Sequence, residues 1–175
     1  MEKELEILTQ IQENGNITQR EIAEKTGLSL GTVNLLLKKM IKTGLIKIEK
    51  LNARTLKYIL TPKGMKEKMA KTYRYIVNTY ETITKIQAVT KVILEKQRNK
   101  GKKNIYLYGK KDEVYNILCM TLNDVVKIFD MKYKFIDNID VIKGKEDYIV
   151  LIWDEKDEDI LKKMQISYIN ILYML

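Results

Sequence analysis

Two short helical segments separated by a glycine turn constrain the fold of this 175-residue chain more than any other feature. Thr18 and Glu21 form a capping box, in which each side chain bonds the other residue's backbone amide at a helix start. The box predicts a helix over residues 19–26, which Gly27 ends, and Ser29 is the N-cap of a second helix. Apolar residues spaced for one buried stripe on this second helix are Val33, Leu36, Leu37 and Met40.

The flanking segments complete a small domain over residues 1–64. Leu5, Leu8 and Ile11 recur at helical spacing before the turn residues 14–16, which predicts a first helix. After Gly44, polar and apolar residues alternate on both sides of a polar turn, which predicts a β-hairpin.

Four stretches of this domain occur in the order residues 17–29 (ITQREIAEKTGLS), 32–34 (TVN), 43–46 (TGLI) and 58–64 (YILTPKG). Together they resemble winged helix-turn-helix transcriptional regulators, in particular those of the MarR type. The resemblance covers about residues 4–64 and implies a DNA-binding domain.

This resemblance implies that the helix after Ser29 enters the major groove and that the hairpin wing reaches the minor groove or its phosphates. Asn34 is the best candidate for reading a base, because its amide can form two hydrogen bonds with adenine. The structural alternatives are that Ser29 only caps the helix and that the lysines only form a solvated face. The predicted DNA-contacting residues are Ser29, Gly31, Thr32, Asn34, Leu35, Lys38 and Lys39 on the helix, and Asn52, Arg54 and Lys57 in the wing.

Charge is divided unevenly along the chain. The net charge is +4 over residues 1–64 and +8 over residues 65–103, but −3 over residues 104–175. A basic front part favours a polyanionic partner such as double-stranded DNA, since lysine and arginine facing phosphates release counterions. A lysine-rich composition typical of an AT-rich genome is the alternative explanation.

Residues 65–100 contain no proline or glycine and are expected to form a long basic linker helix. Thr61 and Pro62 provide the cap and the first helical residue. A helix of this length would pair with its copy in a homodimer, which implies a palindromic operator; the alternative is a helix that breaks and packs back on its own chain. The apolar seam has alternating steps of four and three, and its predicted dimerisation residues are Tyr73, Ile76, Tyr80, Ile83 and Leu94.

The last part of the chain, residues 104–175, is predicted to be a small α/β domain with a parallel sheet, resembling a reduced Rossmann-like domain. Its expected strands are 105–109, 125–130, 148–153 and 168–173, and its expected helices are 114–122 and 157–164. The expected fold class is therefore an α+β winged helix-turn-helix, a long linker helix and a C-terminal α/β domain.

The Rossmann-like resemblance places a small-molecule ligand near Gly109, with Asp130 at the end of the second strand. Bulky residues replace the other two glycines of the phosphate-binding fingerprint, which disfavours dinucleotide binding. A sensor for an unknown ligand or an assembly surface is favoured instead. The acidic run of residues 154–159 could hold a divalent cation, but a helix start is the preferred interpretation.

Residue types exclude several kinds of site. The chain has no histidine and one cysteine, Cys119, which excludes an intrachain disulfide, a Cys-His pair and a Ser-His-Asp triad. No metal or cofactor is expected. The start lacks a signal peptide pattern and no apolar stretch is long enough to span a membrane, so a cytoplasmic regulator without membrane contact is expected. A protein-interaction module and, less favoured, a nucleotide-dependent enzyme are the alternative functions.

Overall fold

The computed structural model describes residues 3–51 and 56–175 and contains two compact units, Met1–Thr79 and Tyr80–Leu175. The boundary between the units falls within helix α4 (Pro62–Asn99), inside the segment expected to be a linker. Each unit has a hydrophobic core of its own. None of the helices in the described ranges is both long and apolar enough to cross a bilayer.

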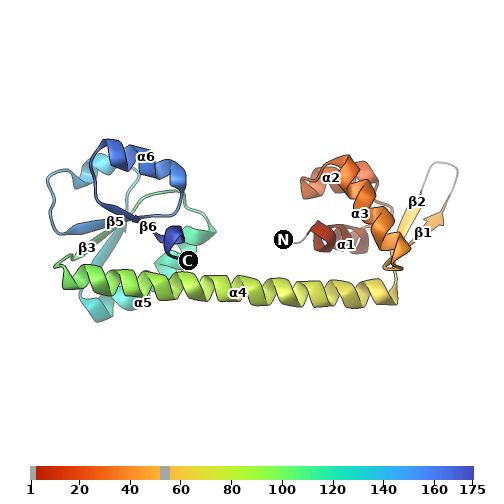
Figure 1. Ribbon diagram of the computed structural model, residues 1–175, viewed down its shortest axis with the longest axis horizontal. Coiled ribbons are helices and arrows are strands. Elements are labelled where there is room, and N and C mark those ends of the chain that lie inside the picture. Colours follow the sequence, from red (N-terminus) through yellow and green to blue (C-terminus); the bar gives the residue numbers. More distant parts are fainter. Residues whose placement is uncertain (1–2, 52–55) are drawn as a thin grey trace. The chain divides into compact units, whose positions relative to one another are not determined.

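The N-terminal unit contains three helices followed by a hairpin, as predicted (Figure 1). The capping box at Thr18 is present, Ser29 caps the third helix, and Gly27 ends the second with φ of 67°. The elements are α1 (Lys3–Glu13), α2 (Gln19–Thr26), α3 (Leu30–Lys42) and the antiparallel strands β1 (Ile46–Lys50) and β2 (Leu56–Leu60).

Two glycines allow backbone segments of this unit to meet closely. A Cβ atom at Gly15 would lie 2.7 Å from the carbonyl oxygen of Tyr58, and one at Gly64 would overlap the carbonyl group of Leu45. Thr61 caps α4 as predicted, because its hydroxyl accepts a hydrogen bond from the Gly64 amide at 3.0 Å. Because both glycines lack a side chain, the turn after α1 can contact β2, and the start of α4 can contact the residue before β1.

The C-terminal unit is built on a four-stranded parallel sheet with the order β4-β3-β5-β6, which confirms the predicted parallel arrangement. Helices α5 and α6 connect strands β3 to β4 and β5 to β6. The elements are β3 (Asn104–Leu107), α5 (Glu113–Phe129), β4 (Lys132–Phe135), a 3-10 helix (Ile139–Ile142), β5 (Tyr148–Ile152), α6 (Glu155–Lys163), β6 (Tyr168–Asn170) and a 3-10 helix (Ile171–Met174).

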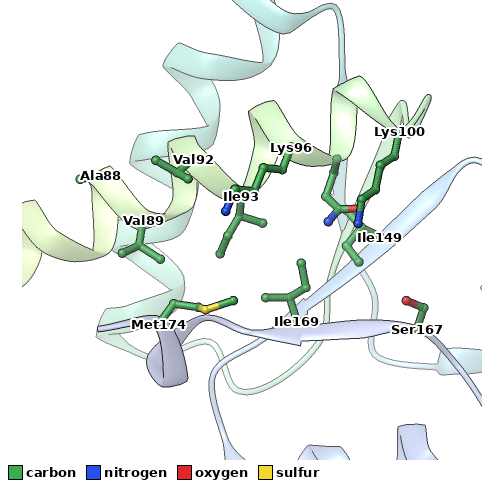
Figure 2. Close-up of a pocket in the computed structure, with 11 residues that line it drawn as sticks. Ala88, Val89, Val92, Ile93, Lys96, Lys100, Ile149, Ser167, Ile169 and Met174 are labelled. Carbon is green, nitrogen blue, oxygen red and sulfur yellow. The ribbon is translucent and has the colours of Figure 1, made fainter.

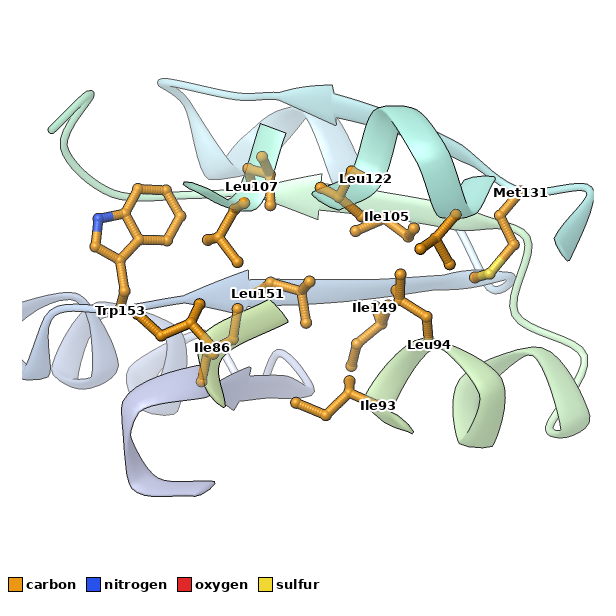
Figure 3. Close-up of a cluster of buried hydrophobic side chains, with 13 residues drawn as sticks. Ile86, Ile93, Leu94, Ile105, Leu107, Leu122, Met131, Ile149, Leu151 and Trp153 are labelled. Carbon is orange, nitrogen blue, oxygen red and sulfur yellow. The ribbon is translucent and has the colours of Figure 1, made fainter. Parts of the chain in front are cut away.

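Both faces of this sheet are buried, since successive residues of the central strands point to opposite sides. Ile105 and Ile149 pack with side chains of α4 and α5, as Figure 3 shows. Tyr106 and Val150 pack on the other face, in a core that also contains Leu161 of α6. The second part of α4 thus serves as a layer of the C-terminal unit and not only as a connection.

The strand predicted over residues 125–130 is wrong. These residues continue α5 to Phe129, because Val125 extends a helical stripe of buried residues that begins at Leu118. The strand that follows is Lys132–Phe135, a short segment at the edge of the sheet. The run of β-branched residues therefore favoured a strand locally, while burial against the sheet favours a longer helix.

The last predicted strand, 168–173, is shorter in the structure. Strand β6 ends at Asn170, whose side-chain oxygen accepts a hydrogen bond from the Leu172 amide at 3.1 Å and so caps a 3-10 helix. Helix α6 begins two residues before the predicted start, because Asp154 is its N-cap.

Candidate nucleic-acid interface

Helix α3 has one face in the core and one in solvent. Val33, Leu37 and Met40 are buried, whereas Leu35 is 70% exposed. Gly31 and Lys38 are exposed on the same side as Leu35, and Asn34 lies between them, half-buried. The structure therefore brings four of the predicted DNA-contacting residues together on one solvent-facing surface, which we call the α3 face: Gly31, Asn34, Leu35 and Lys38.

Ser29 and Thr32 lie at the start of α3 and bond each other. The Ser29 oxygen accepts a hydrogen bond from the Thr32 amide at 3.2 Å, and the two hydroxyl oxygens are 2.8 Å apart. Ser29 therefore has a structural function as the helix cap. Ser29 also lies beside the exposed N-terminus of α3, where unpaired backbone amides favour the binding of a phosphate.

Lys39 is exposed but does not belong to the α3 face. Its ammonium nitrogen lies 2.8 Å from Oε1 of Glu4, and the ammonium of buried Lys71 lies 2.8 Å from Oε2 of the same carboxylate. The hydrogen bond from Lys39, followed by that from Lys71, lowers the pKa of Glu4. Lys39 thus connects α3 to α1, which gives it a structural function that the expectation of a phosphate contact did not include.

The wing is anchored to the helices through Tyr58. Its amide donates to the Gly15 carbonyl at 2.8 Å, and its hydroxyl accepts a hydrogen bond from the Gln19 side chain at 3.2 Å. Lys57 is half-buried and stands opposite Glu49 in the hairpin register. Asn52 and Arg54, the other predicted wing contacts, lie outside the described residues.

Three exposed residues of α2 and α3 were not among the predicted contacts. Leu30 is 48% exposed at the first position of α3, and Lys42 is exposed one turn beyond Lys38. Arg20 is exposed near the start of α2. The spacing of Lys42 from Lys38 could have identified it, because residues four apart share a helix face.

Four of the five predicted dimerisation residues form part of a stripe on α4. Tyr73, Ile76 and Tyr80 are 70%, 58% and 69% exposed, and Ile83 is half-buried. The structure differs at Leu94, which is fully buried in the core of the C-terminal unit of its own chain. The helix is continuous from Pro62 to Asn99, so it does not break, and its second part packs on the sheet of its own chain.

Gly109 and Asp130 are not brought together. Gly109 follows the carboxyl end of β3, whereas Asp130 precedes β4 and caps the end of α5 with φ of 52°. Because β3 and β4 are parallel, these two positions lie at opposite ends of the strands. The expectation that Gly109 and Asp130 meet at one ligand site is therefore wrong. Gly109 has a packing reason instead, because a Cβ atom there would lie 3.0 Å from the Trp153 ring.

The acidic run serves the start of α6. The Asp154 carboxylate accepts a hydrogen bond from the Lys156 amide at 3.0 Å, and buried Glu158 accepts one from the Asn170 side chain at 2.9 Å. Together with Lys162, Asn170 lowers the pKa of Glu158 to about 2, which keeps this carboxylate charged. Within residues 3–51 and 56–175 no cluster of three or more acidic or cysteine side chains is arranged to hold a metal ion.

A family model of winged helix-turn-helix DNA-binding domains matches residues 2–47. The N-terminal unit is a winged helix-turn-helix domain. The match covers α1 to α3 and the beginning of β1, and the structure adds the second strand of the wing. The predicted winged-helix resemblance and the α+β layout are therefore confirmed.

Comparison with solved structures gives a match to the zinc-dependent MarR family transcriptional regulator AdcR in its Zn(II)-bound state. The identity is 20%, the TM-score is 0.35, and the match covers 73% of this chain and 75% of the other. No curated protein matches the chain. The assignment of the winged helix-turn-helix domain rests on the family model and on the order of helices and strands.

Proposed function

We propose that the protein is a transcriptional regulator that binds specific DNA sequences as a homodimer in the cytoplasm. The observation that carries this proposal is the α3 face of the winged helix-turn-helix domain. It presents a hydrogen-bonding amide, Asn34, and an exposed cation, Lys38, on the helix that such domains place in the major groove. No enzymatic activity forms part of the proposal.

The exposed stripe on α4 supports the dimer. Tyr73, Ile76 and Tyr80 lie on one side of the helix, and each exposes more than half of its surface. Large apolar side chains gathered on one exposed surface are typical of protein contacts. Pairing of two α4 helices along this stripe would make a two-fold dimer, which matches a palindromic operator. The C-terminal unit would then serve as a sensor or as a further assembly surface.

Salt dependence of binding tests the proposal against the alternative of a protein-interaction module. Full-length protein is titrated into a labelled duplex at several salt concentrations, and binding is followed by fluorescence anisotropy. We expect affinity for DNA to fall steeply as the salt concentration rises. Lys38→Gln should reduce by about one the slope of the logarithm of the binding constant against the logarithm of the salt concentration. Lys127→Gln, an exposed lysine on α5, is the matched control and should leave the slope unchanged. Weak binding that salt does not change would contradict DNA binding and favour the alternative.

A further inference from the structure

The C-terminal unit contains a cavity of about 560 Å³ between α4 and the edge strand β6. Val89 and Ile93 of α4 point across it toward Ile169 and Met174, as Figure 2 shows. Ile149 of β5 also lines it. This volume lies in the range of about 300–1,000 Å³ that binding sites for small organic molecules occupy.

The floor and walls of the cavity are apolar and built into the core. Ile93 and Ile149 are only 4% and 2% exposed and belong to the core that α4 forms with the sheet. Their positions are fixed by packing, so the floor is preformed. Met174 is 58% exposed and adds a wall that can adapt to different shapes, because methionine is flexible.

Positive charge gathers along one side of the cavity. Lys96 and Lys100 line it together with two neutral polar residues, Gln97 and Ser167, and no acidic residue is among its lining. Figure 2 shows Lys100 extending from beyond the end of α4 toward Ile149. Neither lysine forms an ion pair with a described residue. An apolar cavity with an uncompensated cationic side is suited to a ligand that has an apolar body and an anionic end.

A second copy of α4 fits this surface poorly. Residues 80–103 contain seven lysines and arginines against two glutamates, so another copy would bring more positive charge to Lys96 and Lys100. Like charges placed together at an interface are unfavourable. Charge complementarity thus favours an anion over the chain's own helix.

We propose that this cavity binds a small amphiphilic carboxylate. Its apolar chain would lie against Val89, Ile93 and Ile169, and its carboxylate would accept hydrogen bonds from Lys96 and Lys100. This inference deepens and rests on the regulatory function proposed for the C-terminal unit. Ligand binding is measured without DNA, so that either proposal can fail alone.

Isothermal titration calorimetry of full-length protein with decanoate, below the concentration at which decanoate aggregates, tests the site. Decyltrimethylammonium has the same apolar chain with the opposite charge and is the matched ligand control. We expect saturable binding of one decanoate per chain and at least about tenfold weaker binding of the cation, since the cation loses charge-assisted hydrogen bonds. No saturable binding of decanoate, or equal binding of both probes, would overturn the proposal.

Variants locate the binding. Val92 is 50% exposed and lines the cavity, so Val92→Glu should fold and should abolish decanoate binding. Lys96→Gln together with Lys100→Gln should weaken binding at least about tenfold. Lys91→Gln, an exposed lysine on α4 outside the cavity lining, should leave binding unchanged. Decanoate binding to Val92→Glu that is as tight as binding to the unchanged protein would show that the cavity is not the ligand site. The same conclusion would follow if Val92→Glu dissociated a dimer but left decanoate binding unchanged.

Discussion

Asn34 is the residue on which sequence specificity depends most in this account. It lies on the α3 face between Gly31 and Lys38. Asn34→Ala should remove discrimination worth about 1–3 kcal/mol at one base position of each half-site, because the bidentate contact with adenine is lost. Binding to duplexes substituted one base at a time measures this effect. Lys38→Ala is the control, since it should lower affinity for all sequences alike; an unchanged base preference in Asn34→Ala would contradict the assignment.

Glu4 holds α3 and α4 to α1 through Lys39 and Lys71. Glu4→Gln should lower the free energy of unfolding of the N-terminal unit by about 1 kcal/mol, since charge-assisted hydrogen bonds at a partly buried site are lost. The pKa of Glu4 is lowered in the folded protein, so this stabilisation should be present above about pH 4.5 and should disappear as the pH falls further.

Urea denaturation at neutral and acidic pH, followed by circular dichroism, measures this contribution. Glu24→Gln, at an exposed position on α2, is the control and should change stability little. Equal stability of Glu4→Gln and the unchanged protein at neutral pH would contradict the structural function of the Glu4 cluster.

Local contacts of single residues could be predicted, whereas contacts between distant residues could not. The bonds of Thr18, Ser29 and Thr61 join groups three residues apart, and their spacing indicates them directly. The ion pair of Lys39 with Glu4 joins residues 35 positions apart, and no pattern within either helix indicates it. For this reason Lys39 was predicted to contact phosphate.

At the scale of elements, α6 and β6 are joined by the buried carboxylate of Glu158. It accepts hydrogen bonds from Asn170 and Tyr168 of β6 at 2.9 and 3.1 Å. Its pKa is lowered from 4.5 to about 2, so the stabilisation should be complete above pH 4.5 and should be lost as the pH falls toward 2. Thermal melting of the C-terminal unit at several pH values should show this loss. At neutral pH, Glu158→Gln should melt at a lower temperature than the unchanged protein, and its melting temperature should depend less on pH. A melting temperature that depends on pH as steeply in the variant would contradict this function of Glu158.

The stripe on α4 carries the prediction about assembly. Ile76→Asp should weaken the dimer at least about tenfold, because it places a charge among apolar side chains that would be desolvated on pairing. Sedimentation equilibrium of the full-length protein measures the change. Lys85→Asp, exposed on the opposite side of α4, is the control and should leave the dimer intact. An unchanged mass for Ile76→Asp would count against pairing along this stripe.

Helices and strands whose apolar residues recur with a clear period were predicted well. Those in which this period conflicts with the local preference of the side chains for strand or helix were not. The alternation around Tyr58 indicates the hairpin, and the capping residues indicate α2 and α3. Residues 125–129 include strand-forming side chains but lie in α5, because helical spacing from Leu118 buries Val125 against the sheet. Leu94 follows the same seam as Ile76 but is buried in its own chain, which only the position of the sheet determines.

For the molecule as a whole, the net positive charge lies in the winged helix-turn-helix domain and along α4, whereas residues 104–175 carry a net charge of −3. The sign of the charge therefore changes after the end of α4 and not at the boundary between the two units, which falls within α4. The order of domains could be predicted because each has its own periodic pattern. The cavity beside β6 could not, because it depends on how α4, β5 and β6 pack against one another.

Selection from a random-sequence duplex pool with full-length protein tests the central claim most directly. A homodimeric winged-helix regulator should enrich a palindrome whose half-sites are centred about 10 base pairs apart or a multiple of that spacing. Asn34→Ala should then enrich a motif that differs at one position of each half-site. Failure of the dimeric protein to enrich any sequence would contradict specific DNA recognition by the α3 face.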